Sequence, residues 1–401
     1  MITASLVSLL LCATNPVCHA ELIFPPQPLH NHGSSLVETP DGDLLAVWFH
    51  GTGERKNDDV QLMGARLSAE QRANGETEWS TPFLMADTPD LPDCNPVLFV
   101  DPRGTLWLFW VAIQNNEWGG ALLKYRTSND FEGEGPPRWA WQDVVHTRPR
   151  NLEPRYNAML DAIDADLGAL IDASDSLARE VEAARAASHD KLARRLGWMT
   201  RIHPIMTSDT RMMLGLYSDV FNCGLAAFSE DWGKTWTFSE PILDPSARNV
   251  GNIQPSFVVK ENGDIVAFMR DNGLLNRLPI STSTDGGFTW SPLARLPIPN
   301  PGSSVECIAL KDGNWLLVCN DLVEGRHRLT AYLSSDEGAT WPWSRPIEEA
   351  PEGKGSFSYP SVIEAKDGLI HCTYSWRREG SDGSSIKHAA LNEAWVRKGN
   401  S

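Results

Sequence analysis

One octapeptide pattern occurs three times in the second half of the chain. The segments from Ser229 to Trp236, from Ser283 to Trp290 and from Ser334 to Trp341 each read Ser-x-Asp-x-Gly-x-Thr-Trp. Their closing tryptophans are 54 and then 51 residues apart. A repeated unit of roughly fifty residues cannot bury its apolar face alone, so the units must stack or close into a ring.

The residues of the octapeptide are suited to a turn that is stabilised by hydrogen bonds within the turn itself. Aspartate and hydroxyl side chains bond to nearby backbone groups, glycine takes a backbone conformation that other residues resist, and the tryptophan enters the apolar layer between sheets. The pattern resembles the Asp box of sialidases and their relatives, which lies on the outer strands of propeller blades, away from the active site. This resemblance predicts the architecture without naming a reaction.

Six hairpins predict the number of blades. Apolar runs flank polar turns at Asp41-Gly42-Asp43, Arg103-Gly104, Ser208-Asp209, Asn262-Gly263-Asp264, Asp312-Gly313 and Asp367-Gly368. Such runs around tight turns are typical of β-hairpins. Trp79 and Trp139 stand where degenerate boxes would end, and Ile386-Lys387-His388 is expected in the last strand before the ring closes. We therefore predict an all-β, six-bladed propeller, within the usual range of about 4 to 8 blades.

One interval breaks the period and predicts an insertion. The turns at Gly104 and Asp209 are 105 residues apart, and residues 151–196 between them are rich in alanine and charge. Their apolar positions have helical spacing with a break at residues 172–176, which predicts a helical hairpin between blades two and three. The hairpin is interpreted either as decoration on the side of the propeller or as a lid or wall beside a central pocket.

The N-terminus has features of an export signal. Residues 1–20 carry no charged side chain, contain an apolar run from Leu6 to Ala13 and end in Cys18-His19-Ala20. This pattern predicts a signal peptide, a secreted or periplasmic protein and a single propeller domain over residues 21–401. No other segment is long enough to cross a membrane, so no membrane partner is expected.

Charge and cysteine content narrow the partners. A net charge of −17 argues against binding nucleic acid, and an anionic substrate would need a local cationic pocket.

Five cysteines follow the predicted signal peptide. Cys307 and Cys319 flank Gly313 symmetrically, which predicts that they face each other across a hairpin. We expect two buried thiols there in preference to a disulfide. The cysteine and histidine spacing indicates no zinc site, and we expect no metal or cofactor.

Polar residues just before the first strand and just after the second strand of each hairpin are expected to converge on the propeller axis. Convergent polar groups in a concave site are the default active-site hypothesis. The positions are His30, Asn31, His32, Glu54, Arg55, Asp58, Asp59, Asn95, Arg201, His203, Asp219, Gln254, Arg270, Asp271, Glu306, Asn320, Arg326, Ser358, Tyr359, Tyr374, Arg377 and Arg378.

Three segments extend the resemblance beyond the boxes. Residues 36–48, 254–270 and 358–368 are similar to the sialidase-related BNR repeat family, and the likeness covers nearly the whole mature chain. Sialidases hold a substrate carboxylate with three arginines, use an aspartate as acid/base and attack through a tyrosine that a glutamate activates.

The resemblance implies roles for individual residues of this chain. Arg270 and Arg326 match the second and third arginines, Asp59 or its neighbour Asp58 matches the acid/base, and Tyr359 matches the nucleophile. Planar guanidinium groups suit a carboxylate. Four further residues are predicted to bind substrate: Arg201, Arg377, Asn95 and Glu54.

Two positions depart from the sialidase pattern. His32 stands in the place of the first arginine, and Gln254 stands where the glutamate partner of the tyrosine is expected. These departures indicate either another helper for the tyrosine, such as Glu306, or another reaction.

Three functions follow from this reading. The leading hypothesis is a sialidase-like exo-glycosidase that acts on an acidic sugar. The second is a lyase on a uronic-acid linkage, in which His32 or His203 would abstract the C5 proton and Tyr359 would protonate the leaving oxygen. The third is a carbohydrate-binding propeller without catalysis. The sequence indicates no oligomeric state.

Overall fold

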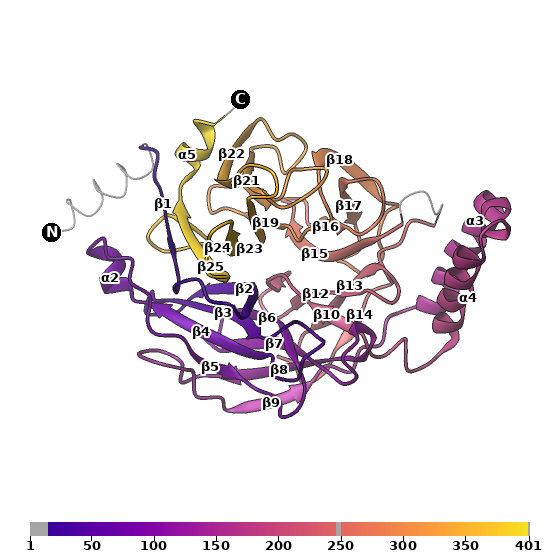
Figure 1. Cartoon of the computed structure of the whole chain (residues 1–401), viewed down its shortest axis with the longest axis horizontal. Helices are drawn as coiled ribbons and strands as arrows, with labels where there is room; N and C mark the ends of the chain where they lie inside the picture. Colours follow the sequence, from indigo (N-terminus) through magenta and orange to yellow (C-terminus); the bar gives the residue numbers. More distant parts are fainter. Residues whose placement is uncertain (1–14, 246–249, 400–401) are drawn as a thin grey trace.

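A computed structural model describes residues 15–245 and 250–399, and in it six β-sheets surround a central axis (Figure 1). In blades 1, 2, 4 and 5, four consecutive strands form an antiparallel sheet whose first strand lies innermost. The predicted six-bladed β-propeller is confirmed.

The strands of blades 1 to 3 run in chain order. Blade 1 contains β2 (His30–Glu38), β3 (Leu44–Gly51), β4 (Gln61–Leu67) and β5 (Phe83–Ala86). Blade 2 contains β6 (Asp93–Val100), β7 (Leu106–Ile113), β8 (Ala121–Ser128) and β9 (Trp141–Val144). Blade 3 contains β10 (Trp198–Thr200), β11 (Ile205–Met206), β12 (Met212–Ser218), β13 (Cys223–Ser229) and β14 (Thr237–Phe238), and its inner edge is split because β10 and β11 both pair with β12.

Blades 4 to 6 complete the ring. Blade 4 contains β15 (Asn252–Val259), β16 (Ile265–Asp271), β17 (Arg277–Ser283) and β18 (Ala294–Pro299). Blade 5 contains β19 (Glu306–Ala309), β20 (Trp315–Cys319), β21 (Arg328–Ser334) and β22 (Trp343–Glu349). Blade 6 contains β23 (Gly355–Glu364), β24 (Ile370–Arg378), β25 (Ser384–Leu391) and β1 (Cys18–Leu22). Each of the six predicted turns joins the innermost strand of a blade to its second strand.

The N-terminal strand closes the ring. β25 contains the predicted last strand, but β1 pairs with it from outside, Glu21 opposite His388. Blade 6 therefore takes its fourth strand, β1, from the N-terminal end of the chain, and no Asp box precedes that strand. Of the predicted signal peptide, residues 1–14 lie outside the described residues, whereas Cys18, His19 and Ala20 belong to β1. The signal peptide stays a prediction.

The three Asp boxes make the same set of hydrogen bonds. In each box the serine hydroxyl donates to the aspartate and accepts from the glycine N–H, while the threonine N–H and hydroxyl donate to the same aspartate. Each box also packs on the preceding blade. Tyr125 Oη donates to the Gly233 carbonyl at 3.1 Å, and Arg211 Nη1 donates to the Gly286 carbonyl at 2.9 Å. The boxes therefore fasten neighbouring blades together.

We expect the combined replacement of Asp231, Asp285 and Asp336 by alanine to lower the free energy of unfolding by about 3 kcal/mol. Each solvent-exposed box would lose about 1 kcal/mol of hydrogen bonding, and the distant sites should add. Urea denaturation measures the loss. Asp209→Ala, in an exposed turn, is the control with expected wild-type stability, and an unchanged midpoint in the triple variant would contradict a fastening role.

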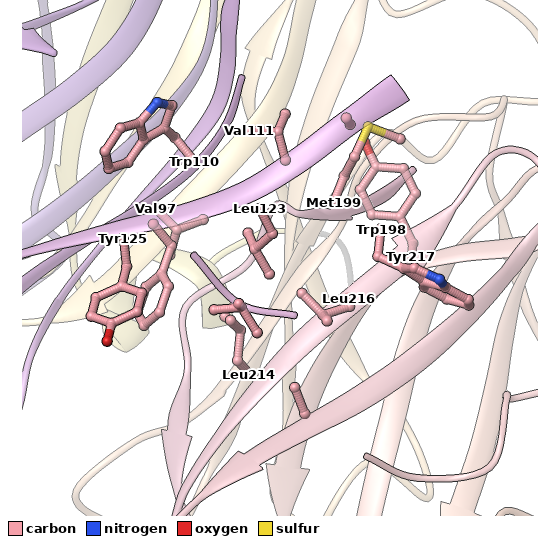
Figure 2. Close-up of a cluster of buried hydrophobic side chains, with 14 of the residues drawn as sticks. Val97, Trp110, Val111, Leu123, Tyr125, Trp198, Met199, Leu214, Leu216 and Tyr217 are labelled. Carbon is pink, nitrogen blue, oxygen red and sulfur yellow. The ribbon is translucent and has the colours of Figure 1, made fainter. Parts of the chain in front are cut away.

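Apolar side chains fill the space between blades. Figure 2 shows this layer between blade 2, which contributes Val97, Leu123 and Tyr125, and blade 3, which contributes Leu214 and Leu216. All five side chains are buried.

The predicted helical insertion is confirmed as α3 (Leu152–Asp172) and α4 (Asp175–His189), between blades 2 and 3. The two helices lie side by side at the outer edge of the ring, far from its axis (Figure 1). The interpretation as a lid is therefore wrong. The base of α3 nevertheless contacts the blade 3 loop, because the Tyr156 ring meets the Phe221 ring edge-on with centroids 5.1 Å apart.

The remaining helices are short. They are α2 (Ala69–Ala73), the 3₁₀ turn η1 (Trp118–Gly120) and α5 (Glu393–Arg397). No helix in the described ranges is long and apolar enough to span a membrane. The prediction that Cys307 faces Cys319 is wrong, since Cys307 pairs with Leu317 across the hairpin, and both thiols are free and buried.

A chain of buried histidines joins three strands of blade 6. His371 Nδ1 lies 2.9 Å from His388 Nε2, and His388 Nδ1 lies 2.5 Å from a carboxylate oxygen of Glu21. His371 Nε2 lies 3.1 Å from Asp367. Burial lowers the pKa of His371 to about 4, despite the opposing effect of Asp367.

This histidine makes stability depend on pH. As pH falls from about 6.5 towards 4, the unfolded chain binds a proton at His371 that the folded chain does not, so the free energy of unfolding should drop by roughly 3 kcal/mol. We expect His371→Gln to remove this part of the pH dependence, measured by urea denaturation between pH 7 and pH 4. His146→Gln, at an exposed position, should leave the slope unchanged; an unchanged slope in His371→Gln would contradict the assignment.

Candidate functional site

A repeated distortion of the innermost strands aims polar side chains at the axis. Asn95, Gln254 and Tyr359 have φ values of +53°, +57° and +60°, each directly before a proline and inside a register shift of its strand. Gly33 occupies the same place in β2 with φ +63°. A left-handed conformation is unfavourable for a tyrosine, and such strain concentrates at functional sites.

Asn95, Gln254 and Tyr359 line one central cavity of about 270 Å³, here called the inner lobe. It lies on the side of the propeller where the innermost strands begin. Its walls are His32, Phe49, Glu54, Asn95, Trp118, Tyr217, Asp219, Gln254, Arg270, Asn272, Arg326 and Tyr359.

Tyr359 is held by cations. Arg270 Nη1 donates to the Tyr359 hydroxyl at 2.9 Å, and the Arg326 guanidinium lies 5.3 Å from the ring centroid. Burial raises the pKa of Tyr359, but Arg270, Arg326 and a hydrogen bond from Gln254 outweigh it, so the pKa lies below its ordinary value. Neither arginine forms a salt bridge with a carboxylate in the described part of the chain. Two guanidinium groups that form no salt bridge among the described residues therefore face the cavity.

His32 packs against Tyr359. The ring centroids are 4.2 Å apart. Burial, together with the neighbouring positive groups, holds the pKa of His32 well below its ordinary value, so the imidazole is neutral at neutral pH.

Two carboxylates of the inner lobe have opposite pKa shifts. Burial raises the pKa of Asp219, and Glu54 adds to this, while Arg270 only partly opposes it. The side chain of Asp219 is nevertheless open to solvent at the mouth of the cavity. Burial also acts to raise the pKa of Glu54, but His30, whose Nε2 lies 3.4 Å away, and the nearby arginines lower it overall. Such a pair marks candidate acid and base groups.

Several predicted site residues lie elsewhere. Asp59 accepts hydrogen bonds from the backbone and hydroxyl of Thr52, and Asp58 accepts from Asn116 at 2.8 Å. Both aspartates are exposed and line a separate surface cavity. The prediction of Asp58 or Asp59 as an acid/base beside Tyr359 is therefore not supported, because their loop turns away from the axis.

Glu306 also faces away from Tyr359. One of its oxygens lies 2.5 Å from His203 Nδ1 and the other accepts the Val362 N–H at 2.8 Å. Burial opposes protonation of His203, but Glu306 outweighs it and raises the pKa. This pair fills the axis below the pocket. The predicted roles of Glu306 as a helper for Tyr359 and of His203 as a base are therefore not supported.

Arg201 is a positioning residue. Its guanidinium is buried and donates to the carbonyls of Ser34, Tyr359 and Pro360 at 3.0, 2.7 and 3.3 Å. It therefore fixes the strained backbone of Tyr359 from below, instead of contacting substrate as predicted.

A second cavity of about 480 Å³, here called the outer lobe, adjoins the first. Both lobes share His32, Glu54 and Arg326. The exposed Arg377 lines only the outer lobe. The structure thus brings together Arg270, Arg326, Gln254, Asn95, Glu54, His32 and Tyr359 of the predicted set, with Arg377 beside them.

Four lining residues escaped the prediction: Phe49, Trp118, Tyr217 and Asn272. Tyr217 accepts a hydrogen bond from Asn95 Nδ2 at 3.0 Å. It lies two residues before Asp219, so the alternation along β12 could have placed it on the same face. The proline after Asn95, Gln254 and Tyr359 was the available signal for the bulges.

A larger cavity, of about 600 Å³, lies at the opposite end of the axis and is mostly apolar. Its charged residues are engaged: Glu38 pairs with Arg72, and Glu364 with Lys311. It holds no candidate nucleophile beside an uncompensated cation, so we place the chemistry in the inner lobe. Within the described ranges, no cluster of three His, Cys, Asp or Glu side chains could hold a metal ion.

The family model for a BNR repeat-like domain matches residues 42–156 and 185–372. The chain belongs to this family of BNR-repeat, sialidase-like propellers. The unmatched interval falls within the α3–α4 hairpin.

Known proteins share parts of the sequence and most of the fold. A sialidase from Micromonospora viridifaciens is 26% identical over 182 residues, which are 43% of this chain and 26% of that protein. This chain thus spans about a quarter of the length of that relative. A protein of unknown function from Dyadobacter fermentans has a TM-score of 0.68 at 17% identity, covering 94% of this chain and 98% of that one.

Two glycan-processing enzymes have the same fold. A leech intramolecular trans-sialidase, solved with 2,7-anhydro-Neu5Ac, has a TM-score of 0.66 at 15% identity and covers 94% of this chain and 71% of that one. An α-L-arabinofuranosidase from Fusarium graminearum has a TM-score of 0.60 at 12% identity, with 96% and 99% covered. At these identities the likeness establishes the fold alone.

Proposed function

We propose that this protein is a carbohydrate-active enzyme, a sialidase-like exo-glycosidase that releases an acidic sugar, and that it acts after export from the cytoplasm. The observation that carries the proposal is the Tyr359 hydroxyl, which receives a hydrogen bond from Arg270 in a cavity with two guanidinium groups that form no salt bridge with a carboxylate of the described residues. The family membership and the sialidase relatives support the same class.

Arg270 and Arg326 suit the carboxylate of an acidic sugar. Guanidinium groups bind carboxylates through two parallel hydrogen bonds, and a protein of net charge −17 needs such a local cationic site to admit an anion. Asn95 and Gln254 offer amide groups for sugar hydroxyls.

Tyr359 is the nucleophile of the proposed mechanism. A glutamine at position 254 cannot take a proton, but a lowered pKa activates a nucleophile in another way. Tyr359 Oη attacks the anomeric carbon and passes its proton to ionised Glu54. Asp219, at the open mouth, donates its proton to the leaving oxygen, so the bond to the second sugar breaks as the glycosyl–tyrosine bond forms.

The second half reverses these transfers. Asp219 takes a proton from water as the water oxygen attacks the anomeric carbon, and the tyrosyl oxygen recovers its proton from Glu54. The products are the free acidic sugar and the alcohol, with net retention of configuration.

The test is a product assay on the purified protein. Sialosides and uronic-acid oligosaccharides are incubated with it, and released sugar and ultraviolet absorbance are read together. Release of the acidic sugar without absorbance growth supports the proposal. Absence of product from every glycoside, with binding retained, would replace it by a carbohydrate-binding propeller.

A lyase is the second candidate, because neutral His32 beside Tyr359 is the arrangement that elimination requires. His32 would abstract the proton next to the carboxylate of a uronic acid, and Tyr359 would protonate the leaving oxygen. Elimination leaves an unsaturated sugar, so growth of ultraviolet absorbance decides for the lyase.

A further inference from the structure

We propose that the outer lobe is a subsite for a second anionic sugar, so that the preferred substrates carry an acidic group on both rings flanking the cleaved bond. This inference rests on the proposed acidic-sugar site of the inner lobe and adds the chemistry of the neighbouring position. It is carried by the continuity of the two cavities and by the placement of Arg377.

The two lobes form one cleft. They share His32, Glu54 and Arg326, and the inner lobe alone, at about 270 Å³, is slightly smaller than the usual ligand site of about 300 to 1,000 Å³. The outer lobe adds about 480 Å³. The cleft therefore has room for a sugar ring in each lobe, with the bond between the rings at the shared residues.

The outer lobe is built by blades 6 and 1. Ser356, Ser358, Ser375 and Trp376 of β23 and β24 form one wall, and residues 28–32 at the start of blade 1 form the other. Serine hydroxyls and an aromatic ring are the groups that hold the hydroxyls and the apolar face of a sugar.

Arg377 gives this lobe its charge. It is exposed and has no salt bridge with any carboxylate in the part of the chain described. Its neighbour Arg378 points the other way along β24, where its guanidinium lies 2.9 Å from Glu348 and donates to the Glu349 carbonyl at 2.9 Å. Only one of these adjacent arginines is neutralised, and the unpaired one faces the cleft.

Three arginines are spread along the cleft, whereas its two carboxylates, Asp219 and Glu54, belong to the inner lobe and to the junction. Arg270 lies in the inner lobe, Arg326 at the junction and Arg377 in the outer lobe, none with a carboxylate partner among the described residues. Glu54 at the junction lies 3.4 Å from His30 Nε2. A sugar bearing a carboxylate or sulfate in the outer lobe matches this charge, whereas a neutral sugar leaves Arg377 unused.

The test compares matched pairs of glycans by isothermal titration. In the sialic acid series, a glycosidic dimer of N-acetylneuraminic acid is compared with sialyllactose; in the uronic acid series, a diuronide is compared with a uronic acid linked to a neutral sugar. We expect the diacid to bind at least tenfold more tightly in one series. Arg377→Gln should remove that preference without weakening the monoacid, and added salt should reduce it in the wild type.

The control is Arg138→Gln, which removes the same charge from an exposed arginine of the blade 2 periphery and should keep the preference. Equal affinities in both series, or a preference that survives Arg377→Gln, would overturn the subsite. Turnover measured in parallel separates the two proposals. Hydrolysis without a diacid preference refutes the subsite alone, and a diacid preference without hydrolysis or elimination refutes the enzyme alone.

Discussion

Tyr359→Phe is expected to lower kcat/KM on acidic glycosides by about 10³-fold or more, because the variant loses the atom that bonds to the anomeric carbon. The phenylalanine ring keeps its contact with His32 and its place above Arg201. Binding of the free acidic sugar should therefore survive. Steady-state kinetics and titration of the free sugar measure the two effects separately.

The control for Tyr359→Phe is Tyr332→Phe, which removes a hydroxyl bonded to Asp321 at 2.8 Å in blade 5, away from the cleft. It should retain full activity. Circular dichroism establishes that both variants are folded. Activity within tenfold of wild type in folded Tyr359→Phe would rule out the tyrosine as nucleophile.

Asp219→Asn is expected to reduce kcat by about 10²- to 10⁴-fold on substrates with a sugar leaving group, since asparagine cannot donate the proton that the leaving oxygen needs. A nitrophenyl glycoside leaves without protonation, so its cleavage should fall much less. The pH profile carries a second signature. In the wild type, activity should fall as pH rises through the raised pKa of Asp219 and as pH drops through the lowered pKa of Glu54.

In Asp219→Asn, the decrease in activity at high pH should disappear from the pH–activity profile. Asp209→Asn, in an exposed turn of the same blade, should keep both the rate and this decrease. Equal losses on sugar and nitrophenyl leaving groups would show that Asp219 does not act as the acid.

The propeller was predictable because its signals are local. Every hydrogen bond within an Asp box joins residues at most four positions apart, and each blade begins with an apolar hairpin around a polar turn. The helical insertion was predictable for the same reason. The closing of the ring by β1 was not, because Glu21 meets His388 across almost the whole chain.

The candidate site was predictable only in part. Arg270 and Tyr359 end up together because the end of the second strand of blade 4 and the start of the innermost strand of blade 6 lie near the same mouth of the axis. Asp58 and Asp59 were misassigned because the loop after β3 folds back on itself and on blade 2, which leaves Glu54 at the cavity. Glu306 was misassigned because its direction along the axis depends on His203, from another blade.

The pKa shifts that assign the acid role to Asp219 and the base role to Glu54 could not be predicted from the sequence. Asp219 and Glu54 belong to blades 3 and 1, and their surroundings exist only after the ring has closed. The sequence placed both near the axis, but burial and the neighbouring arginines decide which of them keeps its proton.

The most direct test of the account is to trap the glycosyl–tyrosine intermediate. A fluorinated acidic glycoside with a good leaving group slows breakdown of the intermediate, and peptide mass spectrometry then locates the bound sugar. The account predicts a sugar adduct on the peptide that contains Tyr359, absent from Tyr359→Phe. An active wild-type protein that forms its adduct on another residue, or that releases its first product with inverted configuration and no adduct, would contradict it.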